Sequence, residues 1–147
     1  MASAVSEELR RLVEARAERL CEYCLIHEDD TFFGCEVDHI ISQKHGGPTE
    51  SDNLAFACFV CNRHKGSDIG SVLVRSGELV RFFNPRRDRW GDHFRLEGGL
   101  VMPRTDIAEA TLRILRFNDP ERVLERETLM ALGRYPPANA AARMEST

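Results

Sequence analysis

The chain has 147 residues and a formal net charge of −4, because 24 acidic side chains outnumber 20 lysines and arginines. That balance argues against a protein that simply coats nucleic acid, and ordinary shares of apolar (42%) and charged (30%) residues exclude a collagenous or largely disordered chain. A chain of this length buries most of its unfolded surface on folding and is expected to form one domain.

The charge is distributed unevenly along the chain. Residues 1–37 carry nine acids and four bases, a balance of −5, whereas residues 63–95 carry eight bases and four acids, a balance of +4. An acidic start is therefore followed by a basic middle, and an anionic partner is expected to contact that middle.

An amphipathic helix is the first predicted element. Ser6 can cap it, and the acidic Glu7 and Glu8 suit the positive end of the helix dipole. Apolar residues follow at helical spacing up to the first cysteine pair, namely Leu9, Leu12, Val13, Ala17 and Leu20.

A hairpin and a short helix are expected next. The β-branched stretch 35–41 predicts a strand, the Gly-Gly-Pro sequence at 46–48 a loop, and residues 54–57 the returning strand. Residues 61–65 favour a short helix that Gly66 would end.

The second half of the chain carries weaker signals. Residues 79–83 have the composition of a strand that follows a turn at 76–77, and residues 94–102 that of a hairpin. Two helices are predicted to close the domain, and the remaining residues should form a flexible tail. The ranges are 106–117 and 120–132 for the helices and 134–147 for the tail.

The N-terminal residues and the cysteines bear on the compartment. No apolar run approaches the roughly 20 residues that span a bilayer, and residues 1–11 lack the apolar core of a signal peptide. We therefore expect a cytoplasmic protein without membrane contact. Thiols in that compartment are kept reduced, so paired cysteines point to a metal site rather than to disulfides.

Four of the five cysteines fall in two Cys-x-x-Cys pairs, Cys21 with Cys24 and Cys58 with Cys61, with 33 residues between the pairs. Two such pairs supply the four thiolates that tetrahedral zinc prefers in closed structural sites. Such a zinc would stabilise the fold, contributing roughly 10–16 kcal/mol of apparent folding energy. The alternative is that the pairs arose by accident and the thiols stay free. Cys35, the odd cysteine, is expected to be a small buried apolar residue.

The segment that contains the cysteine pairs also carries polar residues in a definite order. Asp38 and His39 come first, Asn53 stands 14 residues after His39, and Asn62 stands 9 residues after Asn53. Together with the cysteines, this order resembles the zinc-containing, four-cysteine branch of the HNH endonuclease family, of the small stand-alone type. The resemblance covers about residues 21–66, under a third of the chain, and residues 83–90 also look like the downstream part of such members.

The resemblance implies hydrolysis of DNA phosphodiester bonds, and the residue types suit that chemistry. Histidine titrates near working pH, so His39 can take the proton from water as a general base. Asp38 and Asn62 offer hard oxygen ligands that leave room for water and phosphate on Mg²⁺ or Mn²⁺. Neighbouring side chains on a strand point to opposite sides, so Asp38 can hold the ion while His39 faces elsewhere. By the resemblance, Asn53 fixes the loop and helps to orient His39, and the products carry 5′-phosphate and 3′-hydroxyl ends.

The copy in this chain is a His-Asn-Asn version of the motif. Asn62 stands where the family often has histidine, which favours magnesium-like ions over transition metals. Helix geometry excludes His64 from the cluster, because a residue two positions on lies about 200° around the axis, whereas Lys65 shares the face of Asn62. The simpler alternatives are a structural histidine at position 39 and an ordinary turn asparagine at position 53.

Basic residues in and near the +4 segment are the candidate DNA contacts, because nucleic-acid affinity comes largely from phosphate neutralisation. No recognition helix or second domain is evident, and backbone contacts do not read bases, so low sequence specificity is expected. The alternative is a solvated charge run, and Trp90 is expected in the core rather than stacked on a base. The candidate phosphate contacts are Lys44, Arg63, Lys65, Arg86, Arg87 and Arg89.

These patterns predict an α+β fold with a ββα-metal (His-Me finger) core stapled by a four-cysteine zinc site, preceded by a helix and followed by a β-hairpin and two helices. One domain is expected over 1–133, with a motif core at 21–66 and an extension at 67–133. The expected function is a metal-dependent DNA endonuclease. The alternatives are a non-catalytic zinc module that binds nucleic acid or protein, which would have no need of the Asp-His pair, and a secreted toxin nuclease, which the missing signal disfavours.

Overall fold

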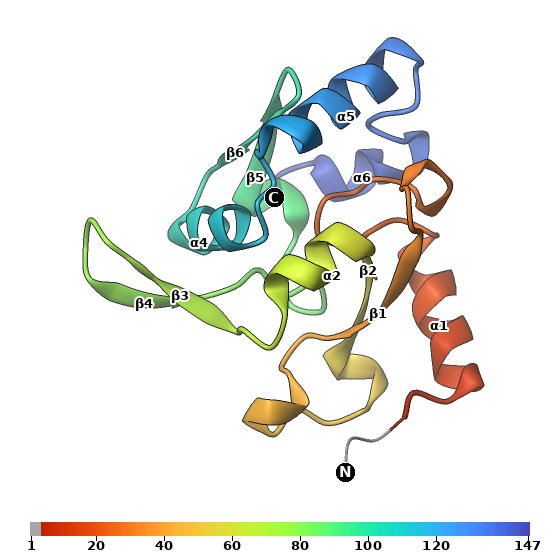
Figure 1. Ribbon diagram of the computed structural model, residues 1–147, viewed down its shortest axis with the longest axis vertical. Coiled ribbons are helices and arrows are strands. Elements are labelled where there is room, and N and C mark those ends of the chain that lie inside the picture. Colours follow the sequence, from red (N-terminus) through yellow and green to blue (C-terminus); the bar gives the residue numbers. More distant parts are fainter. Residues whose placement is uncertain (1–3) are drawn as a thin grey trace.

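The computed structural model describes residues 4–147, which form three two-stranded antiparallel sheets and the helices that pack with them (Figure 1). The mixed α and β class expected from the sequence is confirmed. None of the described helices is long and apolar enough to cross a membrane. In chain order the elements are α1 (Glu7–Ala17), β1 (Cys35–His39), β2 (Leu54–Cys58), α2 (Phe59–Lys65), β3 (Gly70–Leu73), β4 (Glu78–Arg81), α3 (Trp90–His93), β5 (Phe94–Glu97), β6 (Leu100–Pro103), α4 (Asp106–Ile114), α5 (Pro120–Ala131) and α6 (Ala141–Met144).

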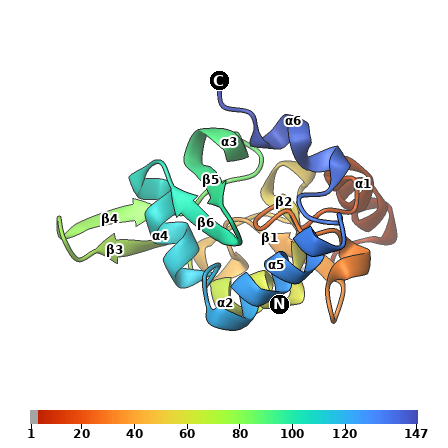
Figure 2. The same cartoon turned by 90° about the horizontal axis from the view of Figure 1, so that it is seen from above.

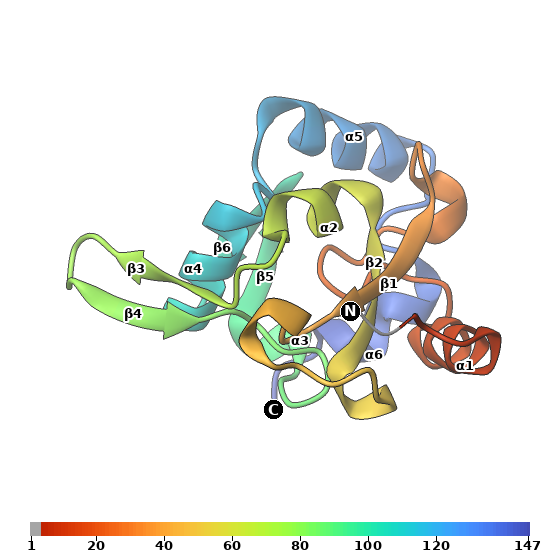
Figure 3. The ribbon, with the colours of Figure 1, turned by 60° about the horizontal axis from the view of Figure 1, so that its bottom comes forward.

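The hairpin β1–β2 and helix α2 form the ββα unit expected from the sequence (Figure 3). The strands pair with Cys35 opposite Cys58 at one end and His39 opposite Leu54 at the other. Strand β1 therefore carries the chain from the cysteine cluster to the candidate catalytic histidine.

Side chains set both boundaries of this unit. Strand β1 ends at His39 rather than at the predicted Ile41, because the amide group of Asn53 hydrogen-bonds both the N–H and the C=O of Ile41 at 2.9 Å. Helix α2 begins at Phe59, earlier than predicted, and Gly66 follows it with a φ of 54°, as the sequence indicated.

Helix α1 covers one face of the β1–β2 hairpin. The hydroxyl of Ser6 accepts a hydrogen bond of 3.2 Å from a backbone N–H of the first turn, so the predicted cap is confirmed. The helix ends at Ala17, and Val13 and Ala17 form a small apolar cluster with two residues of β2, Leu54 and Phe56.

The hairpin β3–β4 extends away from the rest of the molecule (Figures 1 and 2). The sequence predicts only its second strand, because four residues of β3 are too few to show a clear alternation. Leu73 is buried on the side that contacts α4, whereas the cross-strand pair Val72 and Leu79 is exposed.

The last predicted hairpin and both closing helices are present as β5–β6, α4 and α5. Helix α4 stops at Ile114, three residues before the predicted end, and Leu115 and Phe117 then turn into the main core. Trp90 also lies in this core, as expected, with its indole N–H donating to the carbonyl of Tyr23 at 2.8 Å.

Residues 134–147 pack against the rest of the chain, which differs from the flexible tail expected from the sequence. Tyr135 and Ala140 are buried, and the Tyr135 hydroxyl donates to the carbonyl of Cys24 at 2.8 Å. Helix α6 lies beside α3 (Figure 2). The sequence misses this packing because single residues anchor the segment and no helical periodicity marks it.

The packing of the C-terminal segment can be tested at Tyr135. Replacing Tyr135 with Phe removes one buried hydrogen bond and should lower the free energy of unfolding by about 1 kcal/mol. Replacing Tyr135 with Ala leaves a cavity in the core and should cost about 3–5 kcal/mol. Urea denaturation of the zinc-loaded protein measures both values. A tail that stays detached from the core predicts no change in either variant.

Candidate active site and metal centre

Four cysteine sulfurs converge beside the ββα unit. Cys21 and Cys24 come from the knuckle that follows α1, and Cys58 and Cys61 from the junction of β2 with α2. All four residues are buried, and their sulfurs lie within 4.8 Å of one another. In each pair the N–H of the second cysteine donates to the sulfur of the first, at 3.4 and 3.5 Å.

This donor set fits a zinc ion. A tetrahedral site with zinc–sulfur bonds of about 2.3 Å separates its sulfurs by about 3.8 Å. The sulfurs of Cys24 and Cys58 are 3.8 Å apart. Hydrogen bonds from the other three cysteines and the charge of Arg122 hold the pKa of Cys24 well below its usual range, whereas burial raises the pKa of Cys21, so the negative charge of the cluster is concentrated on Cys24.

Helix α5 adds a cation to the cysteine cluster. The guanidinium of Arg122 lies 3.2 Å from the sulfur of Cys24 and 3.9 Å from those of Cys58 and Cys61. Arg122 is 4% exposed, so its charge acts in a dry environment. A zinc ion with four thiolates carries excess negative charge, which Arg122 would partly neutralise.

Asp38 is a buried carboxylate on β1. One oxygen accepts a hydrogen bond of 2.8 Å from the hydroxyl of Tyr23, and the ammonium of Lys65 lies 3.3 and 3.2 Å from the two oxygens. Burial raises the pKa of Asp38, and the charge of Lys65 and the Tyr23 hydrogen bond oppose that rise. Burial and the adjacent carboxylate raise the pKa of Tyr23, so its hydroxyl stays protonated as a donor.

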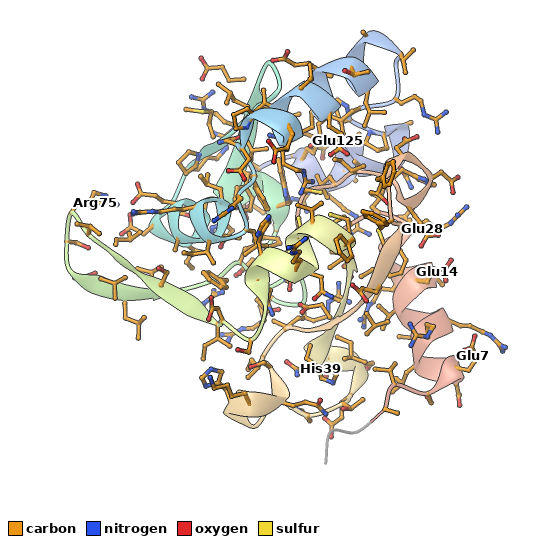
Figure 4. The ribbon with its side chains drawn as sticks, in the orientation of Figure 1. Glu7, Glu14, Glu28, His39, Arg75 and Glu125 are labelled. Carbon is orange, nitrogen blue, oxygen red and sulfur yellow. The ribbon has the colours of Figure 1, made fainter. Side chains whose placement is uncertain are left out.

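His39 lies at the end of β1, next to the loop that leads to β2 (Figure 4). Its Nε2 is 2.9 Å from the hydroxyl of Thr49, and its backbone C=O accepts from the ammonium of Lys65 at 2.9 Å. The imidazole thus contacts the loop while the neighbouring Asp38 contacts the interior, as the two-residue period of a strand predicts.

Asn53 holds the loop after β1 closed. Besides its two bonds to Ile41, its amide NH₂ donates to the carbonyl of Pro48 at 2.9 Å. Gly47 passes so close to this group that a Cβ there would lie 1.7 Å from the carbonyl oxygen of Ile41. Only glycine fits that approach, so Asn53 and Gly47 together define the path of the loop beside His39.

Asp38, His39 and Asn62 line one surface cavity of about 310 Å³. Asn62 is half-buried on α2, and its side chain makes no hydrogen bond within residues 4–147. The carboxylate and amide oxygens suit a hard divalent ion. Between them, Tyr23 and Lys65 contact both oxygens of Asp38, whose side chain is 4% exposed, so an ion would reach this carboxylate from the cavity.

The six candidate phosphate contacts divide into two groups. Lys44, Arg63 and Arg87 are exposed and have no ion-pair partner among residues 4–147. The other three are committed to contacts within the chain, so their positions do not support the expected role. Lys65 pairs with Asp38, Arg86 pairs with the buried Glu22, and Arg89 donates to the carbonyls of Ala142 and Glu145.

The sequence did not predict several residues that contact the site. Tyr23 lies inside the first cysteine pair, and a buried tyrosine hydroxyl needs a hydrogen-bond partner. No feature of the neighbouring sequence indicates that this partner is Asp38. The position of Lys65 on the face of Asn62 is the available signal for its contact with the site. Arg122 leaves no signal, because it is 98 residues from Cys24 in the chain.

Comparisons with known proteins agree with this site. Residues 21–68 match the family model of the HNH endonuclease, a segment that spans both cysteine pairs, Asp38, His39, Asn53 and Asn62. No curated protein and no solved structure matches the chain. The resemblance inferred from the sequence is therefore confirmed for residues 21–68, which match the HNH endonuclease model and contain four cysteines positioned to bind a metal.

The role of Arg122 at the metal centre can be tested by replacing it with Met, which keeps bulk and removes charge. Zinc should then dissociate about 10–100-fold more readily, as is typical when a neighbour of metal ligands is lost. Competition with a coloured chelator measures the affinity. Arg126→Met is the matched control, since Arg126 is equally buried on α5 but donates to the carbonyls of Gly99 and Phe117. Equal zinc affinity in the Arg122 variant and the wild type contradicts the charge argument.

The link from Tyr23 to Asp38 makes a second prediction. Tyr23→Phe should keep its zinc but bind Mn²⁺ about 10–100-fold more weakly, because the hydroxyl that orients the Asp38 carboxylate is lost. Electron paramagnetic resonance of free Mn²⁺ measures that affinity without any activity assay. Tyr135→Phe removes the only other tyrosine hydroxyl of the chain and should leave Mn²⁺ binding unchanged. If both variants bind Mn²⁺ like the wild type, Tyr23 does not position Asp38.

Proposed function

We propose that this protein is a metal-dependent DNA endonuclease that hydrolyses phosphodiester bonds and leaves 5′-phosphate and 3′-hydroxyl ends. The observation that supports it most directly is the meeting of Asp38, His39 and Asn62 around one cavity, on a ββα unit that the cysteine cluster holds together. A zinc module that served only to bind a partner would not need these three side chains in one place.

In this proposal His39 is the general base. Its Nε2 contacts the hydroxyl of Thr49, and when Nε2 carries the proton and donates to Thr49, Nδ1 has the lone pair that accepts a proton from water. Asn53 and Gly47 act through the loop, since they fix the backbone that carries Thr49 towards the imidazole. Asn53 is thus a positioning residue rather than a group that touches the substrate.

Asp38 and Asn62 would hold Mg²⁺ or Mn²⁺ at the cavity. When bound, such an ion stabilises the negative charge that develops on the phosphoryl oxygens and the leaving group. Tyr23 and Lys65 hold the Asp38 carboxylate in one orientation at the cavity. The four cysteines would hold a structural zinc that takes no part in the reaction.

Contacts with DNA would come from Lys44 at the rim of the cavity, Arg63 on α2 and Arg87. All three are exposed and positive. Because such contacts neutralise phosphates and do not read bases, low sequence specificity and strongly salt-dependent binding are expected.

The test is nicking of supercoiled plasmid in Mg²⁺ or Mn²⁺ by the wild type and by His39→Ala. A general base contributes about 10²–10⁴-fold to a rate, so the variant should lose that factor while keeping its zinc content and melting temperature. His64→Ala is the matched control, because His64 lies on α2 but outside the cavity, and its rate should equal that of the wild type.

Two results would contradict the assignment. Equal nicking by His39→Ala and the wild type removes His39 as the base. No nicking by the wild type in any divalent ion, with zinc bound, favours the non-catalytic zinc module that binds nucleic acid or protein.

A further inference from the structure

A cavity of about 530 Å³ lies apart from the candidate active site, between the segment before α3 and helix α6. Four arginines line it, three from the loop that precedes α3 and one from α6: Arg86, Arg87, Arg89 and Arg143. The sequence did not indicate this cavity, because the residues of α6 were expected in a flexible tail.

Positive charge in this cavity exceeds the negative charge available to balance it. Of its two carboxylates, Asp88 forms a two-point ion pair with Arg81, at 2.8 and 3.0 Å, outside the cavity. Glu22 is the other, and its fully buried carboxylate contacts both Arg86 and Arg143. Outside the lining, Glu18 lies 3.6 Å from Arg143 and Glu145 lies 3.7 Å from Arg89, so Arg87 is the arginine of the cavity that has no carboxylate partner among residues 4–147. The excess positive charge favours an anion.

Arg16 does not line the cavity, but its guanidinium is also influenced by the charges of Glu22 and Arg86. Burial lowers the pKa of Arg16, and so does the charge of Arg86, while the charges of Glu22 and Asp52 oppose that shift. The Nη1 of Arg86, which lines the cavity, is buried and finds no acceptor within the described residues. A buried donor without an acceptor calls for an explanation, and an anion in the cavity would supply the acceptor.

The side chain of Arg87 is available to a ligand. It is exposed and pairs with no carboxylate among residues 4–147. Arg87 also lines the adjoining apolar groove with Ile40 and Ile41, the two residues that follow His39. The arginine cavity is therefore connected through Arg87 to the surface beside the candidate active site.

We propose that this cavity is a phosphate-binding site, separate from the candidate active site, in which Arg87 and Arg143 bind the oxygens of a phosphate group. Guanidinium groups match phosphate in shape and donate two hydrogen bonds to it at once, and several of them around one cavity suit its several oxygens. The phosphate belongs either to a nucleic-acid strand that continues from the cleavage site or to a free phosphate compound. Its assignment to a nucleic-acid strand rests on the proposed function, whereas the binding of phosphate does not.

The test measures binding of inorganic phosphate by calorimetry, at constant ionic strength set with NaCl and without added Mg²⁺. The wild type should bind phosphate saturably. Arg87→Ala and Arg143→Ala should raise the dissociation constant about tenfold or more, the loss expected for one charge-assisted hydrogen bond. Arg113→Ala removes an equally exposed arginine from α4, away from the cavity, and should bind like the wild type.

Arg143→Ala also removes a contact of Glu22, so Arg87→Ala, which breaks no ion pair, is the variant that separates binding from folding. Equal phosphate binding by Arg87→Ala, Arg143→Ala and the wild type would overturn the proposal. Failure of the wild type to bind phosphate above the level of chloride would overturn it as well.

A second arm identifies the source of the phosphate. A short single-stranded oligonucleotide that competes with inorganic phosphate for the wild type, but not for Arg87→Ala, assigns the site to a nucleic-acid strand. An oligonucleotide that does not compete assigns it to a free phosphate compound. Phosphate binding is measured without Mg²⁺ and without a nicking assay, so a failure of the nuclease assignment and a failure of this site give different results.

Discussion

The first cysteine knuckle, residues 21–24, is the point on which the metal centre, the candidate active site and the C-terminal half all depend. Glu22 accepts from the N–H of Phe56 on β2 and pairs with Arg86, while Tyr23 donates to Asp38. The knuckle carbonyls accept from two distant side chains, Trp90 and Tyr135. A zinc ion on the four sulfurs would contribute roughly 10–16 kcal/mol of apparent folding energy. It would also fix the position of the knuckle that makes all of these contacts.

The buried pair of Asp38 and Lys65 is better explained by geometry than by stability. Removing two charges from water costs nearly as much as their attraction returns, so such a pair contributes little net free energy of folding. The ammonium also donates to the carbonyl of His39, which ties the end of α2 to the end of β1. The pair therefore holds Asp38, His39 and the helix of Asn62 in a fixed arrangement while adding little to stability.

Fewer basic side chains remain unpaired in the folded protein than the count along the chain suggests. The segment 63–95 has a balance of +4, but most of its bases pair with acids drawn from several parts of the chain. These pairs are Lys65 with Asp38, Arg75 with Asp106 and Glu109, Arg81 with Asp88, Arg86 with Glu22, and Arg95 with Glu97. What is left for an anionic partner is a few unpaired side chains rather than a continuous basic stripe, consistent with weak and salt-sensitive binding.

The sequence by itself determined the local elements and the ligand chemistry. Cysteine spacing, caps and turn residues act over a few positions, so the metal cluster, the ββα unit and the starts of α1, α4 and α5 could be predicted. The order of Asp38, His39 and Asn62 led to the resemblance to the HNH endonuclease family. Only the tertiary structure decided which basic side chains have no ion-pair partner. It also decided that Tyr23 and Lys65 contact Asp38, and that Arg122 and Tyr135 contact the first knuckle. Those contacts join residues far apart in the chain, and long-range packing leaves no periodic pattern in a single sequence.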